Sequence, residues 1–207
     1  MGEYAFLLGV AIALLIGVIS PGPSFIYIAR TSVAQSRNHG IAGALGMGVG
    51  AAAFALMAAF GLYIVLENVP WLYLAFKIIG GCYLCFLAYR IWCGAGQPLQ
   101  GTDAAGAMGG GLIRAFYFGL LTQLSNPKTA VVFASIFAAL LPASVPEFSY
   151  LLLGVLAFII DAGWYSIVAF LLSSPASRKT YAGFKTFIDR IAAGILGALG
   201  LKLASDL

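Results

Sequence analysis

Long apolar stretches alternate with short polar connections along the whole chain. A helix needs about 20 mostly apolar residues to cross the hydrocarbon core of a bilayer. Six stretches reach that length, so the pattern predicts an all-α polytopic membrane protein with six transmembrane helices. The predicted spans are residues 4–29, 41–66, 71–92, 112–141, 148–172 and 184–204. They use most of the 207 residues, which predicts a single transmembrane domain over 1–207.

The composition excludes several classes of protein. The chain is 62% apolar and 9% charged, whereas soluble domains are about 45–50% apolar and about 25% charged. Eleven basic and seven acidic side chains cannot cover a soluble surface of this size. A soluble globular enzyme, a disordered chain and nucleic-acid partners are therefore excluded, and the lipid bilayer is the expected surrounding.

Charges at the ends of the spans predict the orientation. Most basic residues lie after the first and third spans and around the last two, whereas the other ends carry mainly acidic residues. Because cytoplasmic connections are enriched in Lys and Arg, both termini are predicted to face away from the cytoplasm. The basic residues concerned are Arg30, Arg37, Arg90, Arg114, Arg178, Lys179, Lys185 and Arg190.

A glycine-rich connection divides the chain into two halves. Residues 94–111 contain seven glycines and read as a flexible cytoplasmic linker between residues 1–93 and 112–207. Each half has three predicted spans. An odd number of crossings forces the halves into opposite orientations, so the sequence predicts a 3+3 inverted repeat of the kind found in many secondary transporters.

Prolines interrupt the first span of each half. A proline inside a helix removes a backbone donor and clashes with the preceding turn, so both spans should break. Broken helices in membranes expose backbone groups that bind charged substrates, although a simple kink is the structural alternative. The expected substrate-binding residues are Ser20, Pro21, Gly22, Pro23, Ser24, Ser125, Asn126, Pro127 and Lys128.

Two charged residues fall near the middle of predicted spans. Asp161 lies in the fifth span and Lys128 in the fourth. A carboxylate at the bilayer centre is costly, and loss of hydration favours its protonated form. We therefore expect Asp161 to carry a proton or to bind a substrate ammonium; an ion pair with Lys128 is the structural alternative. Trp164 and Tyr165, one turn further on, are expected to line the same cavity or to face lipid.

Small residues raise two further questions. Gly46 and Gly50 form a G-x-x-x-G, which allows close helix contact; it serves the fold, a homodimer or a sliding surface, and the sequence leaves these open. Cys82 and Cys85 form a C-x-x-C in the middle of a span. Apolar surroundings suppress thiol reactivity, so we expect them to be packing residues.

The motifs together resemble the LysE/RhtB family of bacterial amino-acid exporters, over essentially the whole chain. They comprise the proline motif at 20–23, the segment 77–84 with its K-x-x-G-x-x-Y-L pattern, the Asn-Pro-Lys at 126–128, Asp161 with the aromatic pair that follows it, and the Gly-Leu-Lys at 200–202. The resemblance implies export of amino acids or close derivatives across the bacterial inner membrane, driven by the proton motive force.

The combined prediction is a secondary transporter. We find no phosphate-binding glycine motif, so an ion gradient is the expected energy source, and no cofactor, resident metal or enzymatic activity is expected. A zwitterionic amino acid would bind between the two breaks, and protons would exchange at Asp161. The alternative is a metal-ion or other small-solute efflux protein, or a channel, on the same scaffold.

Overall fold

The computed structural model describes residues 5–20, 22–68, 70–95, 111–142 and 145–205. These residues form helices and their connecting turns, with no strand among them, so the all-α prediction is confirmed. In chain order the helices are α1 (Ala5–Ile19), α2 (Pro23–Ala34), α3 (Arg37–Asn68), α4 (Pro70–Gly94), α5 (Leu112–Leu124), α6 (Pro127–Leu140), α7 (Glu147–Leu172) and α8 (Pro175–Ser205).

Both predicted breaks are present. The first predicted span divides into α1 and α2, which meet at 59°, and the fourth divides into α5 and α6. Pro23 and Pro127 each occupy the beginning of the second helix, where the N–H that proline lacks would have no partner within the helix. Pro23 and Pro127 thus hold the same position in their helices. Pro21 itself lies outside the described residues.

Three helices extend four or more residues beyond the predicted spans. The first predicted span ended at residue 29, but α2 ends at Ala34. The prediction began the last span at residue 184, but α8 begins at Pro175. Likewise α3 begins at Arg37, before the predicted residue 41. The predicted limits followed hydrophobicity, whereas a helix continues into polar sequence until its capping signals end it. The predicted linker at 94–111 lies mostly outside the described residues.

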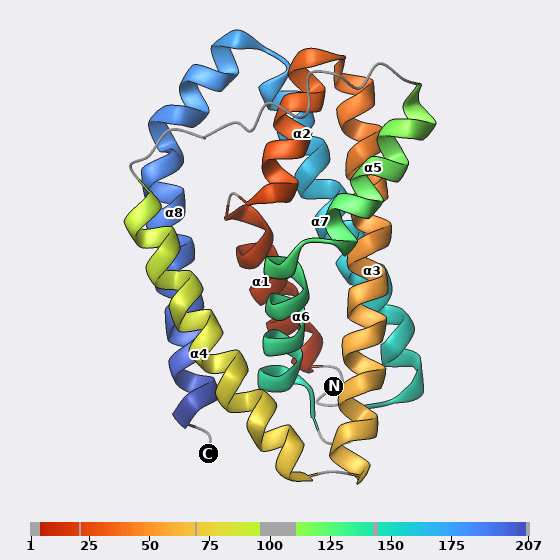
Figure 1. The fold of residues 1–207 in the computed structure, drawn as a ribbon, viewed down its shortest axis with the longest axis vertical. Helices are drawn as coiled ribbons and strands as arrows, with labels where there is room; N and C mark the ends of the chain where they lie inside the picture. Colours follow the sequence, from red (N-terminus) through yellow and green to blue (C-terminus); the bar gives the residue numbers. More distant parts are fainter. Residues whose placement is uncertain (1–4, 21, 69, 96–110, 143–144, 206–207) are drawn as a thin grey trace.

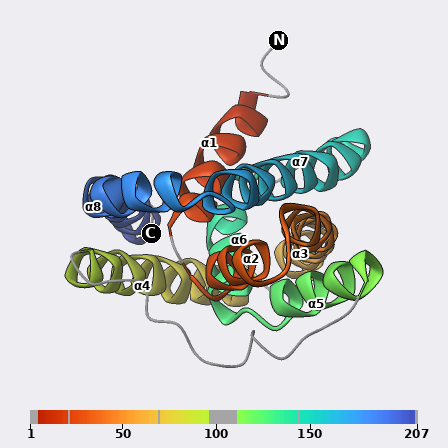
Figure 2. The same ribbon diagram turned by 90° about the horizontal axis from the view of Figure 1, so that it is seen from above.

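The helices form a bundle with α6 at its centre. α4 and α8 pack along one another, and α3 packs against both α5 and α7 (Figure 1). Seen from above, α6 lies between these two groups (Figure 2). Every residue of α6 is described, and none of its large apolar side chains is exposed, whereas α1 exposes Leu8, Ile12 and Leu15. The second half of the second broken span is therefore an interior helix.

Glycines bring α3 and α5 into backbone contact. A Cβ on Gly46 would collide with the carbonyl oxygen of Phe116, and one on Gly119 would collide with the carbonyl oxygen of Gly43. A Cβ on Gly50 would lie 2.9 Å from Cβ of Gln123. Of the three roles left open for the G-x-x-x-G, packing within the fold is the one seen here.

The cysteines lie on α4, on the other side of the bundle. Cys82, Cys85 and Cys93 are free thiols. The Cys85 thiol donates to the carbonyl oxygen of Gly197 over 3.9 Å, and its Sγ would lie 2.8 Å from a Cβ on Gly200. Cys85 therefore packs between α4 and α8, as expected from the sequence, whereas Cys82 is exposed, so the prediction of a packing role was wrong for Cys82.

Apolar side chains cover the outside of the bundle, as expected of a membrane protein. Leu8, Tyr89, Ile113 and Leu201 are each at least two-thirds exposed. Within the described residues, Arg37–Gly61 and Glu147–Leu172 are each long and apolar enough to cross a membrane, and α1 with α2 forms a bent pair that meets the same criterion. The chain is a polytopic helical membrane protein.

Candidate functional site

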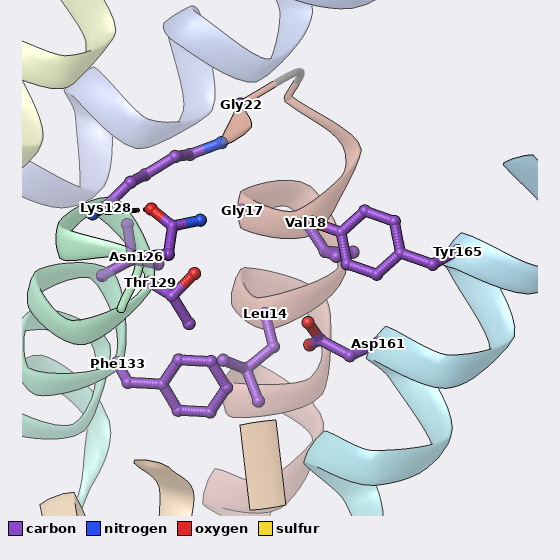
Figure 3. Close-up of a pocket in the computed structure, with 11 residues that line it drawn as sticks. Leu14, Gly17, Val18, Gly22, Asn126, Lys128, Thr129, Phe133, Asp161 and Tyr165 are labelled. Atoms are coloured by element: carbon purple, nitrogen blue, oxygen red, sulfur yellow. Dashed lines mark hydrogen bonds between the residues drawn. The ribbon is translucent and has the colours of Figure 1, made fainter. Parts of the chain in front are cut away.

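The two breaks meet at a small cavity inside the bundle. Its volume is about 20 Å³, enough for about one water molecule and too small for an amino acid. Figure 3 shows the lining residues of α6 on one side and those of α7 on the other, with α1 between them. The lining residues are Leu14, Gly17, Val18, Gly22, Asn126, Lys128, Thr129, Val132, Phe133, Asp161 and Tyr165.

Lys128 reaches from α6 to the first break. Its Nζ donates a 2.7 Å hydrogen bond to the carbonyl oxygen of Ser20, one of the acceptors left free where α1 ends. Gly22 provides the room, because a Cβ there would lie 3.2 Å from Cδ of Lys128. The first break thus contributes a carbonyl and an open space, and the second contributes the ammonium group.

Lys128 and Asp161 line the same cavity without pairing directly. Both residues are described, and no ion pair joins them; the Lys128 ammonium instead bonds to Ser20. The two side chains do interact electrostatically, and Asp189 of α8, which is also buried, interacts with Lys128 as well. The arrangement leaves a cationic and an anionic group facing one small space.

A chain of hydrogen bonds links Asp161 to both breaks. Nε2 of Gln123 donates to Oδ1 of Asp161 over 2.7 Å, and Oγ of Ser24 donates to Oε1 of Gln123 over 2.7 Å. Nδ2 of Asn126 in turn donates to Oγ of Ser24 over 2.8 Å. None of these four residues is more than 4% exposed, so α7, α5, α2 and the start of α6 are held together by polar contacts away from solvent.

Asn126 also caps α6. Its Oδ1 accepts a 3.1 Å hydrogen bond from the backbone N–H of Lys128. Such a cap satisfies one of the donors that a helix leaves free at its N-terminus. Asn126 therefore connects the polar chain directly to the backbone at the second break.

The other residues predicted for the site lie in different places. Tyr165 is buried and lines the cavity, whereas Trp164 is half-buried and packs against the apolar cluster around Phe25 and Ile28. The side-chain Oγ of Ser20 is buried without a hydrogen-bond partner. Three of the predicted residues are exposed, namely Pro23, Ser125 and Pro127.

Gln123 is the residue that the sequence prediction missed. It lies four residues before Pro127, at the end of α5. Its position could have indicated this role. A glutamine in the middle of an apolar span needs hydrogen-bond partners for both its carbonyl oxygen and its NH₂ group. Polar residues at such a depth face the interior of a bundle.

Groups that would bind a resident metal do not gather in the described part of the chain, where no three His, Cys, Asp or Glu side chains form a cluster. What the cavity does offer is a lysine and a carboxylate. These match the two charged ends of a zwitterion.

Known proteins resemble this chain over nearly its whole length. The chain is 32% identical to the threonine efflux protein of Salmonella typhi, over 94% of this chain and 95% of that protein. It is 30% identical to the threonine efflux protein of Escherichia coli K12, over 95% and 96%, and 23% identical to the leucine efflux protein of Salmonella choleraesuis, over 92% and 88%. No solved structure matches it. The model of the LysE type translocator family matches residues 15–207, and the chain belongs to that family.

Proposed function

We propose that this protein exports amino acids from the cytoplasm across the bacterial inner membrane, as a secondary transporter driven by the proton motive force. Family membership and the efflux proteins among its relatives support amino-acid export. The observation that carries the proposal is the cavity where both helix breaks meet, because it holds Lys128 and Asp161 together.

The two charges match the two ends of an amino acid. The substrate carboxylate binds the Lys128 ammonium in place of the Ser20 carbonyl. The substrate ammonium binds Asp161 through Oδ2, since Oδ1 already accepts from Gln123. Both charges of the substrate are then compensated inside the bilayer, where uncompensated charge is costly.

Six crossings follow if each broken pair counts as one span. α1 with α2, and α5 with α6, then correspond to one another, as do α3 with α7 and α4 with α8. The ends of α1 and α8 that lie nearest the termini are at the same end of the bundle (Figure 1). Arg37 and Arg114 lie at the opposite end, which is the cytoplasmic one by the charge rule.

The small cavity represents a closed state of the transport cycle. An amino acid does not fit in about 20 Å³, so the helices around the breaks separate on one side of the membrane to admit it. Asp161 binds either a proton or the substrate ammonium, and this competition exchanges one for the other as the halves move.

Export from loaded cells tests the proposal. Cells expressing the protein are loaded with dipeptides of one amino acid at a time, and the released amino acid is measured. Wild-type protein should accelerate release of one class, and Asp161→Asn should abolish that acceleration. Glu147→Gln is the matched control, because Glu147 is exposed at the start of the same helix.

Three outcomes would contradict the proposal. If no amino acid is released although the protein reaches the membrane, amino acids are not the cargo. If Asp161→Asn exports at the wild-type rate with the same dependence on external pH, Asp161 does not exchange the proton. If Glu147→Gln fails as well, the loss reflects α7 as a whole.

A further inference from the structure

Gln123 occupies the middle of the polar chain, and both ends of its side-chain amide are hydrogen-bonded within it. It is 1% exposed. Its Oε1 accepts from Ser24 and its Nε2 donates to Asp161, both over 2.7 Å. It lies on α5, directly before the second break, while its two partners lie beyond the first break and on α7. One side chain thereby joins the buried carboxylate to the start of α2.

The charge of Asp161 sets the direction of every bond in the chain. A carboxylate only accepts hydrogen bonds, so Gln123 must turn its NH₂ group towards Asp161. Its carbonyl oxygen then faces Ser24, which must donate its hydroxyl proton. The hydroxyl oxygen is left to accept from Asn126, and the amide oxygen of Asn126 is left to cap the N–H of Lys128.

We propose that Gln123 is a positioning residue that couples the charge of Asp161 to both helix breaks. The coupling rests on the proposed function only in that Asp161 is the group that exchanges a proton for the substrate. Gln123 itself contacts neither the proton nor the substrate, and acts through Asp161, Ser24 and Asn126.

Neutralisation of Asp161 removes the constraint on the direction of the chain. A protonated carboxyl group still accepts through its carbonyl oxygen and can also donate through its hydroxyl, so Gln123 can keep its orientation or present its oxygen to Asp161 and its NH₂ to Ser24. In the reversed orientation Ser24 donates to Oδ1 of Asn126, and Asn126 turns its NH₂ towards the N–H of Lys128. Two donors face each other in that arrangement, and the cap of α6 is lost. Proton binding on α7 thereby gives access to an arrangement in which the N-terminus of α6 is uncapped.

The shape of Gln123 matters as well, which restricts the choice of test. Its Cβ and Cγ pack against Gly50 of α3, within 3.0 Å of where a Cβ on Gly50 would be. A truncation would disturb that contact and report on packing. Gln123→Glu keeps the shape and replaces the donating NH₂ with a second carboxylate oxygen, so it changes only the hydrogen bonding and the charge.

The experiment compares wild type, Gln123→Glu, Asp161→Asn and the double variant as purified full-length protein in lipid nanodiscs. Asp161→Asn keeps an acceptor for Gln123, so its Tm should stay near that of wild type. Gln123→Glu places two carboxyl groups together, and its Tm should fall by about 4–8 °C at neutral pH. In the double variant the introduced asparagine donates to the introduced glutamate, and the Tm should return most of the way. Thr122→Val, the preceding residue of α5, controls for substitution in this helix.

Acid should also rescue Gln123→Glu. Two carboxyl groups that share one proton are accommodated, but two ionised ones are not, so the Tm deficit should grow as pH rises. The other titratable groups facing this point are Lys128 and Tyr165, with Asp189 near Lys128. They are present in all four proteins, and the Asp161→Asn background shows their share of the pH dependence.

Hydrogen–deuterium exchange in the first turn of α6 reports on the break itself. Exchange there should be faster in Gln123→Glu than in wild type at the same pH, and should be restored in the double variant. If the Tm losses of the single variants simply add, or if α6 exchanges equally in all four proteins, the coupling is wrong. These measurements need no substrate. Failure of the wild type to export any amino acid would therefore overturn the proposed function and leave the coupling to be decided by Tm and exchange.

Discussion

The two helix breaks begin their second helices in the same way and are capped differently. Pro23 and Pro127 are each the first residue of a helix. The residue before Pro23 is Gly22, which has no side chain to cap α2, whereas the residue before Pro127 is Asn126, which caps α6 with its Oδ1. The two helices thus begin with the same backbone arrangement but with different side chains around it. The first break contributes a carbonyl and space, and the second contributes charge and hydrogen-bonding groups.

The surroundings of the breaks differ in the same sense. α5, before the second break, touches the backbone of α3 through Gly119, while α1, before the first break, meets a side chain, because a Cβ on Gly17 would lie 3.1 Å from Cγ1 of Val132. α6 is interior and α1 is partly on the outside. The second break is therefore held more rigidly, which suits the half of the site that carries the polar groups.

The largest loss of export should come from removing the Lys128 ammonium group at the second break. Lys128→Met deletes the ammonium group that bonds to the Ser20 carbonyl and that would bind the substrate carboxylate. Loss of a hydrogen bond to a charged group costs about 1.5–3 kcal/mol, so export should fall about 10- to 100-fold. The rate of amino-acid release measures this. Lys202→Met, at an exposed lysine of α8, is the control; equal losses in both variants would remove the special role of Lys128.

The next largest effect should be on stability, and it should differ between α5 and α1, the helices that precede the two breaks. Gly119→Ala forces α5 away from the Gly43 carbonyl and should cost about 1–3 kcal/mol, the usual range for overpacking. Gly17→Ala needs only a small shift of the Val132 side chain and should cost less. Thermal unfolding of the purified proteins gives both values. If Gly17→Ala lowers the stability more than Gly119→Ala does, the second break is not held more rigidly than the first.

The smallest loss of stability should distinguish the N-terminus of α6, which Asn126 caps, from that of α2, which no side chain caps. Asn126→Ala removes the cap of α6 and should lower the stability by about 0.5–2 kcal/mol. Gly22→Ala removes no cap, and the flexible Lys128 side chain yields to the added methyl, so its Tm should stay closer to wild type. Asn126→Asp, which retains a capping oxygen, should keep more of the stability than Asn126→Ala. A Tm of Asn126→Ala equal to that of Gly22→Ala would show that capping does not differentiate the breaks.

Much of the fold followed from hydrophobicity and proline placement, because both act locally. The apolar stretches, the two breaks and the family were predictable from the sequence. The limits of α3 and α8 were not, since polar residues continue these helices beyond the apolar stretch. The burial of Gln123 was predictable from its place in an apolar span, but its partners Ser24 and Asp161 were not, because they are distant in the chain. Only the folded bundle shows that a single glutamine among apolar residues connects α5 to α2 and α7.

The chain from Asn126 to Asp161 also restricts how the protein can evolve. Each member has one donor or acceptor role that is fixed by its neighbour, and the members come from both halves of the protein. A mutation at one position leaves a buried group without its complement, so it is disfavoured until a second position changes too. Variation at Ser24, Gln123, Asn126 and Asp161 should therefore occur in concert, and a new cargo would be reached more readily by changing the apolar lining, such as Leu14 or Phe133, than by changing these four.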